Sequence, residues 1–164
     1  KNEHTFLGID QNNIPSIIKT KGNKYGHIIL RGGRNGPNYE DVYINKLEED
    51  LLKNNVNSVV IVDCSHGNSL KQFQRQETVA ENVGQQVKNG NKTIKGIMLE
   101  SNINEGNQPI TNNLKYGVSV TDGCVSISKT NEILNNLFLD MFLDNIFFII
   151  SYLSSNVSFS KSGK

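Results

Sequence analysis

Three residues of this chain could bind a metal or transfer a proton. His66 follows the apolar run of residues 58–63, and Glu100 follows the run of residues 93–99. Asp122 lies in a Thr-Asp-Gly sequence. One imidazole and two carboxylates from separate segments make a plausible open site for a borderline divalent cation such as Mn²⁺, Fe²⁺ or Zn²⁺. Three protein ligands also leave coordination positions free for substrate or water.

Each member of this set also has a simpler interpretation. His66 could be a structural histidine, Glu100 a carboxylate in solvent and Asp122 a turn residue. Cys64 stands two residues before His66, so the two share a face if the strand continues. Cys64 could then be a fourth ligand or a small buried thiol of the core. Asn68 is expected to cap the helix that follows.

Arg31 is a candidate for binding an anion. It follows the apolar run of residues 26–30 and enters the sequence Gly32-Gly33, where a ligand can approach the backbone. A planar guanidinium suits bidentate binding of phosphate or carboxylate. The alternative is a solvated arginine before a glycine turn.

These residues lie in a chain that alternates strand-like and helix-like segments. Strands are predicted for four apolar runs, residues 4–9, 26–30, 58–63 and 93–99. Helices are predicted for residues 38–54 and 69–90, and for a segment that begins near Thr130, while residues 15–26 are typical of a small β-ribbon. Strands that alternate with helices imply an α/β fold with a parallel sheet.

The ends of the predicted strands favour a barrel. Arg31, His66 and Glu100 stand just past the last apolar residue of three successive runs. Reactive groups from successive strands meet at one rim of a (β/α) barrel, whereas an open sheet gathers its ligand contacts at one switch point. A complete barrel takes roughly 250 residues, and this chain has 164 with four predicted strands. The sequence therefore predicts half of a barrel.

The composition excludes some classes of partner. The chain is 36% apolar and 20% charged with a net charge of +1, which gives no electrostatic case for nucleic acid or an anionic membrane. Two cysteines make a poor disulfide framework, and the N-terminal residues lack the apolar segment of a signal peptide. We therefore expect a reduced, cytoplasmic protein.

The C-terminal segment differs from the rest. Residues 137–153 are strongly apolar, but Asp140 and Asp144 interrupt them. Because charges at a bilayer centre are costly, an amphipathic or exposed helix is expected here and not a membrane span. Residues 154–164 are expected to form a disordered tail.

Four motifs of the chain, in order, resemble class I 3-deoxy-D-arabino-heptulosonate 7-phosphate (DAHP) synthases. They are HIILRGG, DCSHGNS, IMLESNINEGNQ and LKYGVSVTDGC, and the resemblance covers about residues 4–135. GNS, SNINEGNQ and LKYGVS look most like the fungal, amino-acid-regulated type. The resemblance implies a TIM barrel, with residues 1–136 as about four β/α units of its C-terminal half and residues 137–164 as an atypical hydrophobic helix and tail.

The family resemblance also implies a function. Such a transferase condenses phosphoenolpyruvate with D-erythrose 4-phosphate in the first step of the shikimate pathway to aromatic amino acids. By motif match, His66, Glu100 and Asp122 would bind a divalent metal (Mn, Fe, Co or Zn), and His66 and Asp122 would be catalytic. Arg31 would bind the phosphate of phosphoenolpyruvate. A homo-oligomer is implied for the full-length enzyme.

The chain departs from the family pattern in several places. The family's fourth metal ligand, a cysteine, and most of its phosphate-binding lysines and arginines belong to the N-terminal half, outside these residues. Cys64 stands where relatives carry an aromatic residue. Phe6 and Gly8 are weak candidates for the amino-acid inhibitor site, but Asp10-Gln11 replaces the usual Thr-Lys after them.

The isolated chain is expected to be inactive, because four unpaired strands expose two sheet edges and apolar helix faces. Two other interpretations stay open. The chain could be a non-catalytic barrel fragment that pairs with another chain. It could also belong to a related metal-dependent 3-deoxy-ulosonate phosphate synthase that acts on another aldose phosphate.

Overall fold

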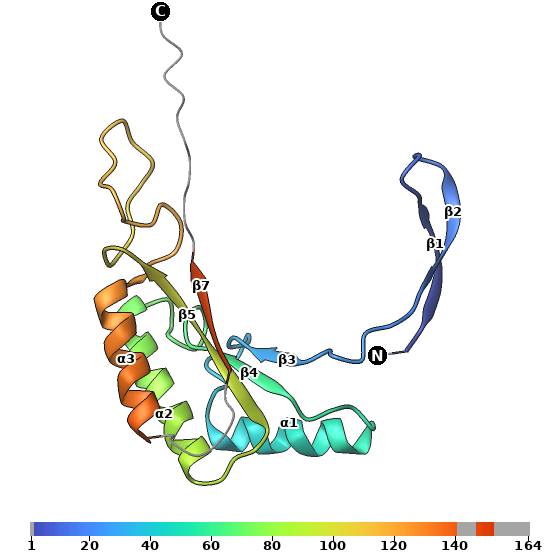
Figure 1. Cartoon of the computed structure of the whole chain (residues 1–164), viewed down its shortest axis with the longest axis horizontal. Coiled ribbons are helices and arrows are strands. Elements are labelled where there is room, and N and C mark those ends of the chain that lie inside the picture. The colour runs from blue at the N-terminus through green and yellow to red at the C-terminus, as the bar shows by residue number, and fades with distance from the viewer. Residues whose placement is uncertain (1, 141–146, 153–164) are drawn as a thin grey trace, which may run out of the picture.

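The computed structural model describes residues 2–140 and 147–152 (Figure 1). Its strands are β1 (His4–Ile9), β2 (Pro15–Thr20), β3 (Ile28–Leu30), β4 (Val60–Asp63), β5 (Ile94–Asn102), β6 (Val125–Ser126) and β7 (Phe147–Tyr152). Its helices are α1 (Asp41–Lys53), a short 3₁₀ helix (Phe73–Arg75), α2 (Gln76–Lys88) and α3 (Ile127–Asp140).

A parallel sheet forms the centre of the molecule. Its strands run in the order β3-β4-β5-β6, and β7 also pairs with β5. Every pair in this sheet is parallel. All four residues of β4 are buried, as predicted for a strand that is covered on both faces. These features confirm the predicted α/β class.

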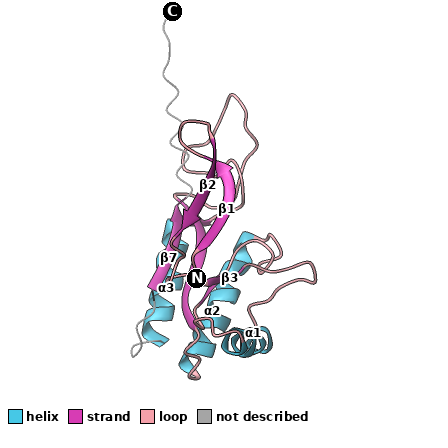
Figure 2. Ribbon diagram, turned by 90° about the vertical axis from the view of Figure 1, so that its right-hand side faces the viewer, coloured by secondary structure: helices cyan, strands magenta, loops and turns pink. Residues whose placement is uncertain are grey.

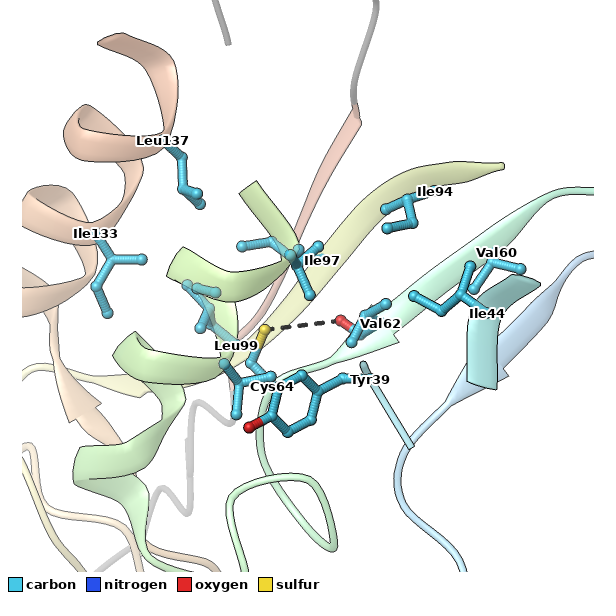
Figure 3. Packing of buried hydrophobic residues seen from close by; sticks show 13 residues of the cluster. Tyr39, Ile44, Val60, Val62, Cys64, Ile94, Ile97, Leu99, Ile133 and Leu137 are labelled. Atoms are coloured by element: carbon cyan, nitrogen blue, oxygen red, sulfur yellow. Dashed lines mark hydrogen bonds between the residues drawn. The ribbon is translucent and has the colours of Figure 1, made fainter. Parts of the chain in front are cut away.

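The helices cover one face of this sheet and build the core with it. Val60 and Val62 of β4 point to the same side because side chains alternate along a strand. They cluster with Ile44 of α1, Val79 of α2 and Ile133 of α3 (Figure 3). Figure 2 shows these helices beside the strands. Fully burying one such aliphatic side chain stabilises a fold by roughly 1.5–3 kcal/mol, so this face holds the carboxyl ends of β4 and β5 in place.

The first predicted strand does not join the parallel sheet. β1 pairs antiparallel with β2, with His4 opposite Thr20 and Ile9 opposite Pro15. The turn between them is closed by backbone bonds of Asp10 to Ile14 and of Asn13 to Asp10. A connection this short allows an antiparallel partner but no parallel crossover. The hairpin stands apart from the sheet in Figure 1, so three of the four predicted strands, and not all four, form the parallel sheet.

The helix predicted for residues 69–90 begins later than expected. Leu70 and Lys71 have φ values of 55° and 60°, which a right-handed helix cannot contain. Residues 67–72 therefore form tight turns, and α2 starts at Gln76. The expectation that Asn68 caps this helix was wrong.

The C-terminal segment also differs from the expectation. α3 begins at Ile127 and ends at Asp140, and residues 147–152 form β7, which pairs with Gly96–Ser101 of β5. One continuous helix over residues 137–153 was therefore wrong for its last part. The tail predicted for residues 154–164 lies outside the described residues. Within the described ranges, no helix is long and apolar enough to cross a membrane.

Candidate metal centre

His66 occupies a strained position just beyond β4. Its φ is +46°, a left-handed value that costs a non-glycine residue roughly 1–2 kcal/mol. Backbone hydrogen bonds hold the turn on both sides of it. Gly67 N donates to Arg31 O at 3.0 Å, and Lys71 N donates to His66 O at 2.8 Å. Backbone strain of this kind persists only where the surrounding structure enforces it, and it clusters at functional sites.

The two nitrogens of the His66 ring have different neighbours. Nδ1 lies 2.8 Å from Asp63 Oδ2 and 2.7 Å from Ser65 Oγ. Nε2 lies 3.4 Å from Glu100 Oε1 and 4.0 Å from Asp122 Oδ2. The ring therefore stands between a buried carboxylate behind it and two carboxylates in front of it.

Glu100 is fixed through its backbone near the end of β5. Its N–H donates to Gln76 Oε1 at 2.8 Å, and its carbonyl accepts from Gln76 Nε2 at 3.2 Å. Burial raises the pKa of the Glu100 carboxyl, the His66 ring lowers it, and the nearby Asp122 charge raises it further. A largely buried carboxylate beside other acids is a group that a bound cation would stabilise in its charged form.

The donor set fits a divalent metal. Ligand atoms of His66, Glu100 and Asp122 all lie within 4.8 Å of one another. Imidazole and carboxylate ligands suit Mn, Fe, Co and Zn, and a small side-chain movement would place all three atoms at bonding distances of about 2.0–2.2 Å from one ion. Glu100 is 8% exposed at its side chain and Asp122 is 62% exposed. The site is therefore closed on one side and open on the other.

A small pocket adjoins these three residues. It measures about 40 Å³ and is lined by Ser65, His66, Ser69, Lys71, Phe73, Glu100, Asp122 and Gly123. A pocket of this size can hold an ion with one or two water molecules but not a whole sugar phosphate. Any larger substrate must therefore extend beyond it into the open side.

Arg31 lies at the same end of the sheet. Its carbonyl accepts the hydrogen bond from Gly67 N described above, which ties the end of β3 to the His66 turn. The Arg31 charge partly offsets the rise in the pKa of Glu100 that burial causes. The structure thus brings together the three residues that the sequence suggested for the metal, and Arg31 lies at the same end of the sheet.

Asn68 fixes the two strand ends to each other and was missed as a site residue. Its Nδ2 donates to Leu30 O at 3.0 Å and to Asp63 O at 2.8 Å, and its Oδ1 accepts from Asn38 N at 2.8 Å. Asn38 Oδ1 in turn accepts from Gly32 N at 2.7 Å. An asparagine just before a predicted helix suggested a cap, and nothing in the sequence showed that Asn68 bonds to Leu30 of a strand 38 residues earlier.

The close contact of the two turns requires glycine. A Cβ on Gly32 would lie 2.6 Å from the Gly67 carbonyl carbon, and Gly32 has a φ of +82°. Any side chain at Gly32 would therefore push the Arg31 turn away from the His66 turn.

Cys64 belongs to the core and not to the metal cluster. It is fully buried and packs with the apolar residues behind the sheet (Figure 3). Burial raises the pKa of its thiol, because the thiolate would be desolvated. The interpretation of Cys64 as a small buried thiol of the core is therefore confirmed, and the alternative of a fourth ligand was wrong.

Phe6 and Gly8 lie in the separate hairpin. A Cβ on Gly8 would lie 2.8 Å from Ile18 Cδ1, so this glycine lets the two strands pack closely. Neither residue belongs to the metal cluster or lines the adjoining pocket. Their role in inhibitor binding stays a prediction.

Three comparisons with known proteins indicate the same family. A family model described as "DAHP synthetase I family" matches residues 1–135. The Tyr-sensitive phospho-2-dehydro-3-deoxyheptonate aldolase of Salmonella typhimurium is 44% identical over 141 residues, which is 84% of this chain and 39% of that protein. The tyrosine-inhibited enzyme of the same name from Schizosaccharomyces pombe is 43% identical over 140 residues, covering 82% and 38%.

A solved structure matches as well. Phospho-2-dehydro-3-deoxyheptonate aldolase from Francisella tularensis SCHU S4 superposes with a TM-score of 0.79 at 39% sequence identity, covering 85% of this chain and 41% of that chain. This chain therefore spans about two fifths of the length of these relatives.

Proposed function

Because the chain belongs to the DAHP synthetase I family, we propose that it supplies the C-terminal half of a TIM barrel that condenses phosphoenolpyruvate with D-erythrose 4-phosphate. The products are 3-deoxy-D-arabino-heptulosonate 7-phosphate and phosphate, in the first step of the shikimate pathway. The observation that carries this proposal is the group of His66, Glu100 and Asp122, whose ligand atoms lie within 4.8 Å of one another, with Arg31 at the same end of the sheet.

The half barrel is supported by the order of the parallel strands. β3, β4 and β5 are neighbours in sequence and in the sheet, each pair is joined by a helix, and the helices lie on one face. Barrel enzymes keep their active sites at the carboxyl ends of such strands. Arg31, His66 and Glu100 stand at that end, which is where the proposed half barrel would present them to a substrate.

Within the proposed site, His66, Glu100 and Asp122 would hold the divalent metal. When bound, the metal would supply Lewis-acid polarisation of the aldehyde oxygen of erythrose 4-phosphate. Arg31 would bind the phosphate of phosphoenolpyruvate, because its planar donors match phosphate oxygens in pairs. The charge of Arg31 would also offset that of the nearby carboxylates.

The chain's own groups suit the bond changes of the reaction. C3 of phosphoenolpyruvate bonds to the aldehyde carbon while the C=O π bond opens and its oxygen takes up a proton. Water adds at C2 and gives up a proton. The C2–O bond to phosphate then breaks as the new C2 hydroxyl passes its proton to the departing phosphate and C2 becomes a ketone. Asp122 is the exposed member of the cluster, so we assign it to accept a proton from the water that adds. His66, held from behind by Asp63, keeps its position while charge changes in front of it.

We expect the isolated chain to be inactive, because one arginine and one metal cluster cannot hold two phosphorylated substrates. The test is complementation. Purified chain is mixed with the complementary N-terminal segment of the Salmonella relative, and loss of phosphoenolpyruvate absorbance is followed with Mn²⁺ and erythrose 4-phosphate. Activity in the mixture but in neither part supports the proposal. No activity in a mixture that forms a stable complex contradicts it.

A non-catalytic fragment that pairs with another chain is the second candidate. It is supported by the apolar side chains that β1 and β2 leave in solvent, with Leu7 77% and Ile17 78% exposed. A stable but inactive complex in the same assay favours this candidate. A related synthase for another aldose phosphate would instead prefer arabinose 5-phosphate over erythrose 4-phosphate in the active mixture.

We also propose that the complete enzyme is a cytoplasmic homo-oligomer. Cys64 and Cys124 are both buried and unpaired, which suits a reducing compartment. The exposed hairpin offers an apolar surface that a second copy could cover.

A further inference from the structure

Asp63 is a buried carboxylate that contacts the rear of the His66 ring. Its side chain is 3% exposed, and its Oδ2 lies 2.8 Å from His66 Nδ1. Its other oxygen, Oδ1, accepts from Ser65 N at 2.8 Å and from Ser65 Oγ at 2.6 Å. Both oxygens of Asp63 are therefore engaged within four consecutive residues of the chain.

These contacts decide which ring nitrogen carries the hydrogen. A carboxylate only accepts hydrogen bonds, so the Ser65 hydroxyl donates its one hydrogen to Asp63 Oδ1. Toward His66 Nδ1, Ser65 Oγ then presents a lone pair at 2.7 Å, as does Asp63 Oδ2 at 2.8 Å. Two acceptors thus meet Nδ1, which must be the donor. A lone pair on Nδ1 would leave a buried carboxylate oxygen without a partner, at a cost of roughly 1–3 kcal/mol or more.

In the neutral ring, which carries one hydrogen, a hydrogen on Nδ1 leaves the lone pair of Nε2 directed toward Glu100 and Asp122. We propose that Asp63, together with Ser65, is a positioning residue that fixes His66 in the Nδ1–H form and so makes Nε2 a metal ligand. This inference rests on the metal site of the proposed function. Histidines that bind metals characteristically donate their other ring hydrogen to a carboxylate or carbonyl, and loss of that partner weakens metal binding about 10–100-fold.

Asp63→Asn is the informative substitution. The amide oxygen can still accept from Ser65, which preserves the turn, while the amide NH₂ then faces His66 Nδ1. Nδ1 becomes an acceptor, and the hydrogen moves to Nε2, where it blocks the metal. Asp50→Asn makes the same chemical change on the exposed side of α1 and serves as the matched control.

The experiment uses the full chain with His4→Gln and His27→Gln substitutions, so that His66 is the one histidine that remains of the three in the sequence. Long-range ¹H–¹⁵N NMR of the metal-free protein at a pH of about 8.5, above the ordinary histidine pKa of about 6.5, reports which nitrogen carries the hydrogen. We expect Nδ1–H in the background chain and in Asp50→Asn, and Nε2–H in Asp63→Asn.

Binding of Mn²⁺, followed by electron paramagnetic resonance, should weaken about 10–100-fold in Asp63→Asn and less than about threefold in Asp50→Asn. A folded Asp63→Asn variant with Nδ1–H and unchanged Mn²⁺ affinity overturns the proposal. If that variant does not fold, the background chain still decides, because a hydrogen on its Nε2 contradicts the assignment. If the background chain does not bind Mn²⁺, the proposed metal site is refuted. Its NMR spectrum would still show whether Nδ1 of His66 carries the hydrogen, and so would test the role of Asp63 separately.

Discussion

Replacing Asn68 with alanine should destabilise the protein, because this side chain joins the ends of β3 and β4. The substitution removes three hydrogen bonds, to Leu30 O, Asp63 O and Asn38 N, each between 2.8 and 3.0 Å. Asn68 is fully buried, so water cannot readily replace the lost partners. At a net value of roughly 1 kcal/mol for each bond, the free energy of unfolding should fall by about 3 kcal/mol.

The assay is urea unfolding followed by circular dichroism, with the same slope required for both proteins so that the midpoints report stability. Asn54→Ala is the control, because this asparagine is exposed and donates one hydrogen bond, to Asp50 O. We expect the control to lose less than about 1 kcal/mol. A loss below about 1 kcal/mol in Asn68→Ala would refute the view that this residue fastens the two strand ends together.

Three further predictions concern the turn contacts, the hairpin and the helix pair. Gly32→Ala should lower the free energy of unfolding by at least about 2 kcal/mol and weaken Mn²⁺ binding. Gly33→Ala is the control: a Cβ at Gly33 would have nothing within 4 Å, so the urea midpoint should change little. Backbone hydrogen bonds from Ile14 and Asn12 lower the pKa of Asp10, so the stability that its charge gives the turn should be present above the ordinary aspartate pKa of about 3.9 and lost as pH falls through the lowered value. NMR shifts of the Ile14 amide against pH should show this, and a transition above pH 4 would contradict it. Lys129→Met should shift the urea midpoint little, although Lys129 Nζ lies 2.7 Å from Glu77 Oε1 and 3.2 Å from Glu132 Oε1, because these ion pairs are partly solvated. A shift as large as that of Asn68→Ala would contradict this.

The sequence predicted the parts of the fold that depend on local pattern. The apolar run Val60-Ile61-Val62 predicts a strand buried on both faces, and all four residues of β4 are buried. His66, Glu100 and Asp122 were predicted as one cluster, because an imidazole and two carboxylates from separate segments suit a divalent metal, and the structure brings their ligand atoms together.

The parts that failed depend on contacts between distant residues or on backbone strain. The partner of residues 4–9 is decided by the short turn at Asp10, which favours an antiparallel hairpin over the parallel sheet. The late start of α2 follows from left-handed φ values at Leu70 and Lys71, which no residue type there indicates. Asn68 serves as a bridge because Leu30 lies beside it, and sequence separation hides that contact.

The sequence contains one indication of the role of Asp63. An acidic residue at the buried end of a strand needs a partner, and a histidine three positions later is within reach. The sequence alone does not reveal the turn that brings Nδ1 of His66 back to within 2.8 Å of Asp63 Oδ2. The left-handed backbone at His66 makes this possible.

The most direct test of this account is a titration of the purified chain with Mn²⁺, in parallel with its Glu100→Gln variant. The substitution keeps the size of the side chain and removes one charged ligand from a cluster whose ligand atoms lie within 4.8 Å. We expect one bound Mn²⁺ for each wild-type chain and an affinity at least about tenfold lower in the variant. Absence of binding to the wild-type chain, or equal affinities for the two proteins, would contradict the assignment of His66, Glu100 and Asp122 as a metal site.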